Sequence, residues 1–194
     1  MLGLIFFIFI IIFILHHFYI YVTKSDTEIN YMTDKLEKIK NTENKIAGFN
    51  AHDRTYAKPL RDYYILGSMN SCLSGDITNG TLSTEALRNT IGLGPRFLDF
   101  EIFSVDGAPV IAAGKDGMNQ KYETENYLNF DYVMGEVSRY ALGGSKYANN
   151  NTDPLFLSFR IKTLNNNIYN TMAESLNLVS NYMWRFRRSD AFMR

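Results

Sequence analysis

The feature that most constrains this chain is an uncharged apolar run at its N-terminus, LGLIFFIFIIIFILHHFYIYV, over residues 2–22. About 20 helical residues cross the hydrocarbon core of a bilayer, and Tyr19 and Tyr21 stand where an interfacial aromatic belt is expected. A signal peptide usually has a basic start and a small-residue cleavage site, but the first Lys or Arg here is Lys24. A buried core helix of this length would be amphipathic. We therefore predict an uncleaved, single-pass membrane anchor over residues 1–23.

A charged, helix-prone stretch follows the apolar run over residues 24–50. Five of its apolar residues recur close to a heptad spacing, which Glu43 interrupts. They are Ile29, Met32, Leu36, Ile39 and Ile46. Two readings are open: a juxtamembrane stalk that forms a homo-oligomer through residues 28–46, or an amphipathic helix packed on its own domain.

The composition of the whole chain excludes some classes of function. The 194 residues have a formal net charge of zero, so no global field attracts nucleic acid, and none is expected as a partner. Hydrophobic residues make up 46% of the chain, which is enough for a packed core. The single cysteine, Cys72, excludes an intrachain disulfide, and no base that would activate its thiol is evident. We interpret Cys72 as a packing residue.

The rest of the chain alternates predicted strands with predicted helices. Strands are predicted in DYYILGSM, RFLDFEIFSV, APVIAAG and PLFLSFRI, with a turn at Asp106-Gly107 and a loop in CLSGDITNG. Helices are predicted in STEALRNTIGLG, which begins with a capping serine, in NFDYVMGEVSRYAL and in NNNIYNTMAESLNLVSNYM. This order predicts an α/β fold in which helices cover a mostly parallel sheet.

Several of these segments, taken in order, resemble the X region of phosphatidylinositol-specific phospholipase C over roughly residues 59–176. The segments are GSMNSCLSG, STEALRNTIGLGPRFLDFEIF, PVIAAG, FDYVMGEVSRYAL and PLFLSFRI. The resemblance implies a phosphoric diester hydrolase fold over residues 56–184, in the form of the first half of an irregular TIM barrel. It is closest in character to X-like proteins of large DNA viruses of algae and protists, several of which carry an N-terminal anchor. A host or virion membrane is therefore the expected location.

The resemblance places the two catalytic histidines of the family at Met69 and Ala113. The three histidines of this chain, His16, His17 and His52, lie in the apolar run or before the domain, so the X-like region contains none. Each proton transfer by such a group typically contributes ~10²–10⁴-fold to the rate, and neither methionine nor alanine can perform it. We therefore predict a pseudoenzyme without catalytic residues. The alternative is an active lipid phosphodiesterase with a rearranged active site.

The calcium ligands of the family are matched only in part. The resemblance aligns Asn70 with an asparagine ligand, and it aligns Asp99 and Glu101 with a Glu-x-Asp pair in exchanged order. It aligns Arg160 with a further acidic ligand. Calcium prefers roughly six to eight oxygens, and a guanidinium would stand where the ion's positive charge belongs. We therefore predict a degenerate metal or phosphate site made of these four residues, with no metal and no other cofactor.

Strand periodicity adds a geometric prediction for this site. Asp99 and Glu101 are separated by one apolar residue, so both carboxylates lie on one face of their strand. Two carboxylates inside a barrel are costly without a counter-ion, and a guanidinium satisfies carboxylates with forked hydrogen bonds. We predict that the Arg160 guanidinium lies within about 4 Å of Asp99 or Glu101. Arg96 and Lys162 are the other candidate partners.

The domain is shorter than a whole TIM barrel, which needs about 250 residues. Either the barrel is truncated, or its open edge is covered by another chain or by the basic, aromatic tail of residues 185–194. We expect a membrane-anchored module that binds a lipid head group or a partner. Membrane lipid, including an anionic phospholipid head group, is the expected ligand class.

Overall fold

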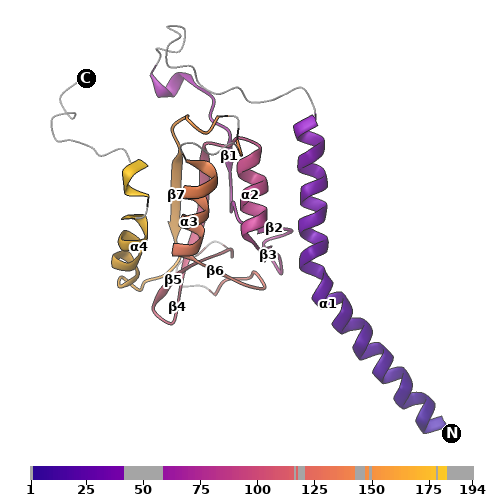
Figure 1. Ribbon diagram of the computed structural model, residues 1–194. Helices are drawn as coiled ribbons and strands as arrows, with labels where there is room; N and C mark the ends of the chain where they lie inside the picture. The colour runs from indigo at the N-terminus through magenta and orange to yellow at the C-terminus, as the bar shows by residue number, and fades with distance from the viewer. Residues whose placement is uncertain are drawn as a thin grey trace.

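A computed structural model describes residues 2–41, 59–115, 117, 121–142, 147–148, 150–177 and 179–182. Its first element is a single helix, α1 (Leu2–Asn41), which contains both the predicted anchor and the beginning of the predicted stalk. Figure 1 shows that the N-terminal half of α1 projects away from the rest of the molecule. By length and composition alone, this helix is able to cross a membrane. The predicted features over residues 42–50 and 185–194 lie outside the described residues.

The C-terminal half of α1 packs on the domain beside α2 (Thr84–Gly92), as Figure 1 shows. Ile29 is buried in this contact, and the amide of Asn89 donates a 2.9 Å hydrogen bond to Thr33 Oγ1. Ile39, another residue of the predicted seam, is exposed. The structure therefore places this segment as a helix packed on its own domain, while its self-association stays a prediction.

The sheet is built around the nine-residue strand β4 (Phe97–Val105). Strand β7 (Phe156–Ile161) and strand β1 (Gly67–Ser68) pair with β4 in parallel. Strand β5 (Ala108–Ala112) pairs with β4 in antiparallel orientation, and β6 (Leu128–Asn129) pairs with β5 in the same way. The described sheet is therefore a mixed, curled half barrel.

The prediction of a mostly parallel sheet was wrong at the β4–β5 pair. Asp106 and Gly107 both have positive φ, +50° and +82°, which is the conformation of a two-residue hairpin turn. Such a turn reverses the chain at once, so the following strand returns along β4. The predicted loop in CLSGDITNG also contains pairing, since β2 (Leu73–Ser74) and β3 (Thr81–Leu82) form a short antiparallel ladder.

Helices α2, α3 (Phe130–Ala141) and α4 (Ile168–Asn177) pack on the sheet, close to the predicted ranges (Figure 1). Short 3-10 helices span Leu60–Asp62 and Ser180–Tyr182. Alternate residues of β4 face these helices and share one apolar core with them. The buried core includes Leu87, Ile91, Leu98, Phe100, Ile102, Phe130, Val133, Met134 and Ile168. Because side chains alternate along a strand, the residues between them lie on the opposite face of the sheet.

The predicted serine cap of α2 is present and gives a first test of the fold. Ser83 Oγ accepts a 3.0 Å hydrogen bond from the backbone N–H of Ala86. We expect Ser83→Ala to lower the free energy of unfolding by about 1 kcal/mol, because it leaves that N–H without its cap. Urea denaturation of the full chain in detergent micelles measures the loss. Aspartate also caps helices, so Ser83→Asp is the matched control, and equal losses in both variants would contradict the assignment.

Candidate functional site

The site lies on the sheet face opposite the helical core, where Arg160 of β7 meets two carboxylates of β4. Arg160 Nη2 lies 2.7 Å from Asp99 Oδ2, and Arg160 Nη1 lies 2.8 Å from Glu101 Oε1. Arg160 Nε also donates to both oxygens of Asp99, at 3.1 and 3.0 Å. The predicted ion pair is therefore confirmed, and it includes both acids.

The strand register explains why these three side chains meet. Parallel pairing sets Glu101 opposite Arg160 and Asp99 opposite Ser158, so all four side chains lie on one face of adjacent strands. Asn70 joins them from the turn after β1. Its φ of +46°, a conformation that asparagine tolerates better than most residues, accompanies a contact in which Asn70 Oδ1 accepts a 2.9 Å hydrogen bond from Arg160 Nη2. The structure thus brings together all four residues of the predicted degenerate site.

Two further groups complete the hydrogen bonding of the carboxylates. Ser158 Oγ donates to Asp99 Oδ1 at 2.9 Å, and the backbone N–H of Gly114 donates to Glu101 Oε2 at 3.1 Å. Sequence reasoning missed both. Ser158 has the same strand parity as Arg160, so it was detectable from the alternation in LSFRI. The Gly114 contact depends on how the chain leaves β5, and no local sequence pattern encodes that path.

The electrostatics of the site keep Arg160 charged. Its hydrogen bond to Asp99, followed by the attraction of both carboxylates, raises the pKa of the guanidinium above its ordinary value, although partial burial opposes this. Glu101 is 1% exposed and Asp99 is also buried, so both carboxylates depend on this cation. One guanidinium and two carboxylates give the cluster a formal charge of −1.

The residues present do not fit a calcium ion. Calcium takes six to eight oxygen ligands and repels nearby cations. Here Asp99 Oδ2, Glu101 Oε1 and Asn70 Oδ1, the oxygens that would face an ion, all contact the Arg160 guanidinium within 3 Å. Arg160 therefore occupies the space and satisfies the ligands that a divalent cation would need.

Another candidate partner, Arg96, lies elsewhere. Its guanidinium donates to the backbone oxygens of Ala141 and Asp153, at 2.8 and 2.5 Å. Burial lowers the pKa of Arg96, and the charge of Asp153 opposes this shift. Arg96 thus ties the end of α3 to the loop before β7, and it does not neutralise the acids of β4.

The two positions that the resemblance aligns with histidines differ in their surroundings, but neither carries a group that transfers protons. Met69 is 67% exposed and lies in an open cleft of about 450 Å³. Ala113 is fully buried, and its carbonyl accepts hydrogen bonds from the backbone N–H groups of Glu123 and Thr124. The cleft is lined by Gly67, Ser68, Met69, Phe97, Asp99 and Arg160.

Cys72 is fully buried in the main core, as the packing interpretation requires. Burial raises the pKa of its thiol well above the ordinary value, so the thiolate needed for nucleophilic chemistry does not form near neutral pH.

Solved structures similar to this chain include two crystal structures of PLC21. PLC21 from L. pealei has a TM-score of 0.49 and 25% sequence identity, and the match covers 61% of this chain and 14% of that chain. PLC21 from S. officinalis has a TM-score of 0.47 and 24% identity, with the same coverage. The chain therefore spans about one seventh of the length of these structures. No protein-family model and no curated protein sequence matches the chain.

The ion pair predicts a large cost for removing Arg160. We expect Arg160→Ala to lower the free energy of unfolding by about 3 kcal/mol, because it leaves two buried carboxylates without their cation. This is the low end of the range for buried pairs, since 30% of the Arg160 side chain is exposed. Arg139→Ala, which removes an exposed arginine of α3, is the matched control for urea denaturation.

The same variant has an expected pH signature. The difference in stability between Arg160→Ala and the parent should narrow as the pH is lowered towards about 4, because protonation removes the negative charge that the variant leaves unpaired. A difference that stays constant over this range would mean that Arg160 stabilises the fold by packing alone.

A charge reversal tests whether Arg160 excludes calcium. We expect the melting temperature of the parent to be insensitive to calcium, and that of Arg160→Glu to rise on calcium addition, because the variant offers carboxylate and amide oxygens without a cation among them. Arg139→Glu makes the same charge change at an exposed position and should not respond. Equal calcium stabilisation of the parent and both variants would contradict exclusion by Arg160.

Proposed function

We propose that this protein is a membrane-anchored, phospholipase C X-like module that binds a ligand or partner and does not hydrolyse phosphodiesters. One observation carries the proposal: the Arg160 guanidinium lies between Asp99 and Glu101 and also binds Asn70. These are the residues that the resemblance aligns with a metal site. A guanidinium cannot dissociate as a metal ion can, so the ion pair is a permanent part of the site.

The absence of proton-transfer groups supports the loss of hydrolysis. Cleavage of a phosphoinositide by the family's route needs a base for the attacking hydroxyl and an acid for the leaving alkoxide. Each of them typically contributes ~10²–10⁴-fold. The positions of these groups are held by Met69 and Ala113, and the X-like region contains no histidine.

A rearranged active site would have to use Asp99 or Glu101 as the base. Both carboxylates already accept hydrogen bonds or close ionic contacts from Arg160, and each accepts a further hydrogen bond, from Ser158 or from Gly114. Accepting a substrate proton would break these contacts inside a buried cluster, which costs more than it would in water. The geometry therefore favours the binding module over the phosphodiesterase.

The open cleft is the surface on which such a module would bind. Met69 and Phe97 contribute apolar walls, while Asp99 and Arg160 contribute polar groups that already contact each other. An anionic head group entering the cleft would meet a cluster with one more negative than positive charge. A partner with apolar groups and hydrogen-bond donors fits this lining better. The N-terminal half of α1 would hold the module at its membrane.

The direct test of the proposal is an assay for hydrolysis. The full chain is reconstituted in phosphatidylcholine vesicles that contain phosphatidylinositol, and diacylglycerol and cyclic inositol phosphate are measured with and without calcium. We expect product levels equal to those of vesicles without protein, because neither Met69 nor Ala113 can transfer a proton. Turnover that calcium stimulates, and that Asp99→Ala abolishes while the exposed control Asp131→Ala preserves it, would overturn the proposal.

A further inference from the structure

The junction between α1 and the domain shows which part of the domain lies nearest to the membrane. This inference rests on the proposed function, in which the apolar half of α1 spans a bilayer. The apolar run ends at Val22, and Lys24 follows two residues later, about 3 Å further along the helix at ~1.5 Å per residue. A head-group layer is roughly 5–7 Å thick, the difference between the whole bilayer and its core divided over two sides. Lys24 therefore lies at the level of the head groups.

Lys24 holds two segments of the domain at this level. Its ammonium donates to the backbone oxygen of Asn79 at 2.7 Å and pairs with Glu125 Oε1 at 2.5 Å. Asn79 belongs to the turn of residues 75–80, and Glu125 belongs to the loop of residues 121–127.

The turn and the loop form one unit with α1. The N–H of Glu125 donates to Gly80 O at 2.9 Å, and the N–H of Asn79 donates to Glu123 O at 3.1 Å. On the α1 side, a Cβ added to Gly75 would lie 2.9 Å from the Glu28 carboxyl carbon. The three segments are thus in close contact where α1 leaves the domain, so the turn and the loop cannot move far from the membrane level of Lys24.

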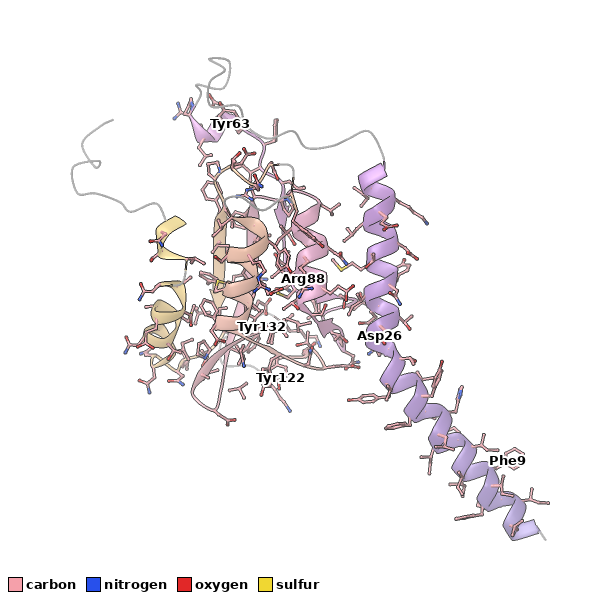
Figure 2. The ribbon with its side chains drawn as sticks, in the orientation of Figure 1. Phe9, Asp26, Tyr63, Arg88, Tyr122 and Tyr132 are labelled. Atoms are coloured by element: carbon pink, nitrogen blue, oxygen red, sulfur yellow. The ribbon has the colours of Figure 1, made fainter. Side chains whose placement is uncertain are left out.

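The loop carries side chains suited to a lipid interface. The rings of Tyr122 and Tyr127 meet edge to face at 5.8 Å, and Tyr127 is 39% exposed. Tyrosine is enriched at the head-group level of bilayers, where its ring and hydroxyl are both satisfied. Figure 2 shows Tyr122 at the end of the domain from which the apolar half of α1 projects, and Tyr63 at the opposite end.

The charges of this surface do not favour anionic lipid over neutral lipid. Lys24 is paired with Glu125, and Lys115 lies 3.3 Å from Glu123. Lys121 adds a further cation and Asp76 a further acid, so acids and cations are equal in number, and such a surface gains little from anionic lipid. Contact with the bilayer would depend on the tyrosines and on the tether.

We propose that the loop of residues 121–127 and the turn of residues 75–80 rest in the head-group layer of the bilayer that holds α1, with Tyr127 as the interfacial aromatic residue. The partner of this surface is a lipid bilayer, and a bilayer of neutral phosphatidylcholine is sufficient. The domain is then docked with this end against the membrane and does not move freely on a stalk.

Depth-dependent fluorescence quenching tests this placement. The full chain, with its native tryptophan removed by Trp184→Phe, is reconstituted in phosphatidylcholine vesicles that carry a spin label either near the head groups or deep in the acyl chains. Single tryptophans are introduced by Tyr127→Trp in the loop, Phe9→Trp in the apolar half of α1 and Tyr64→Trp as the matched control. Tyr64 is fully exposed and follows Tyr63, which Figure 2 places at the far end of the domain.

We expect the shallow label to quench about half or more of the Tyr127→Trp emission, the deep label to quench Phe9→Trp, and neither label to quench Tyr64→Trp. If Phe9→Trp is quenched while Tyr127→Trp behaves like Tyr64→Trp, the membrane anchor is supported and the docking surface is refuted. If Phe9→Trp escapes both labels, the anchor in the proposed function is refuted, and this inference with it. Lys121→Trp, at an exposed position of the same loop, replaces Tyr127→Trp should that variant not fold, and the same outcomes apply.

Discussion

The interaction on which the rest of the site depends is the contact of the Arg160 guanidinium with Asp99 and Glu101. It joins β7 to β4, the strand around which the sheet is built, and the hydrogen bond to Asn70 extends it to the turn after β1. Two carboxylates buried on adjacent positions of one strand face would oppose folding if they were left alone. The guanidinium neutralises these carboxylates and links the two strands with hydrogen bonds of fixed geometry. A polar cluster of this kind is costly to disturb, because the removal of any one member leaves another buried polar group unpaired.

This interaction also determines what the cleft can do. A metal centre leaves coordination positions that substrate and water exchange, and this exchange is the basis of its chemistry. Arg160 offers no exchangeable position, and its donors already contact Asp99, Glu101 and Asn70. At the two positions that the resemblance aligns with histidines, Met69 presents an apolar side chain to the cleft and Ala113 is buried. These walls support the binding role that we propose for the cleft.

The site and α1 are connected by a short series of contacts. Glu101 accepts a hydrogen bond from the N–H of Gly114, and the preceding carbonyl, that of Ala113, accepts from Glu123. Two residues later, Glu125 pairs with Lys24 of α1. The segment that leaves β5 therefore contacts the buried ion pair at one end and α1 at the other. This arrangement gives the half barrel a defined position relative to the helix that would anchor it.

Local sequence patterns determined much of this structure. Four features could be predicted because each depends on neighbours within a few residues. They are the apolar run, the Ser83 cap, the Asp106-Gly107 turn and the alternation around Asp99, Glu101 and Arg160. They predicted α1, α2, the long strand β4 and the side on which the two acids lie. They did not predict that β5 runs antiparallel to β4, although the same Asp-Gly turn contained that information.

Only the tertiary structure decided which partners meet over long separations. Arg96, Arg160 and Lys162 were all candidates for the acids. The parallel register of β7 against β4 brings Arg160 to them, because a shift of one residue would have turned its side chain to the opposite face. The packing of α1 on α2, the Gly114 contact and the Lys24–Glu125 pair likewise join residues that lie far apart in the chain or depend on the path of a loop. The sequence by itself determined which charges must be neutralised, and the fold decided which residue neutralises them, because that choice depends on the pairing of strands 59 or more residues apart.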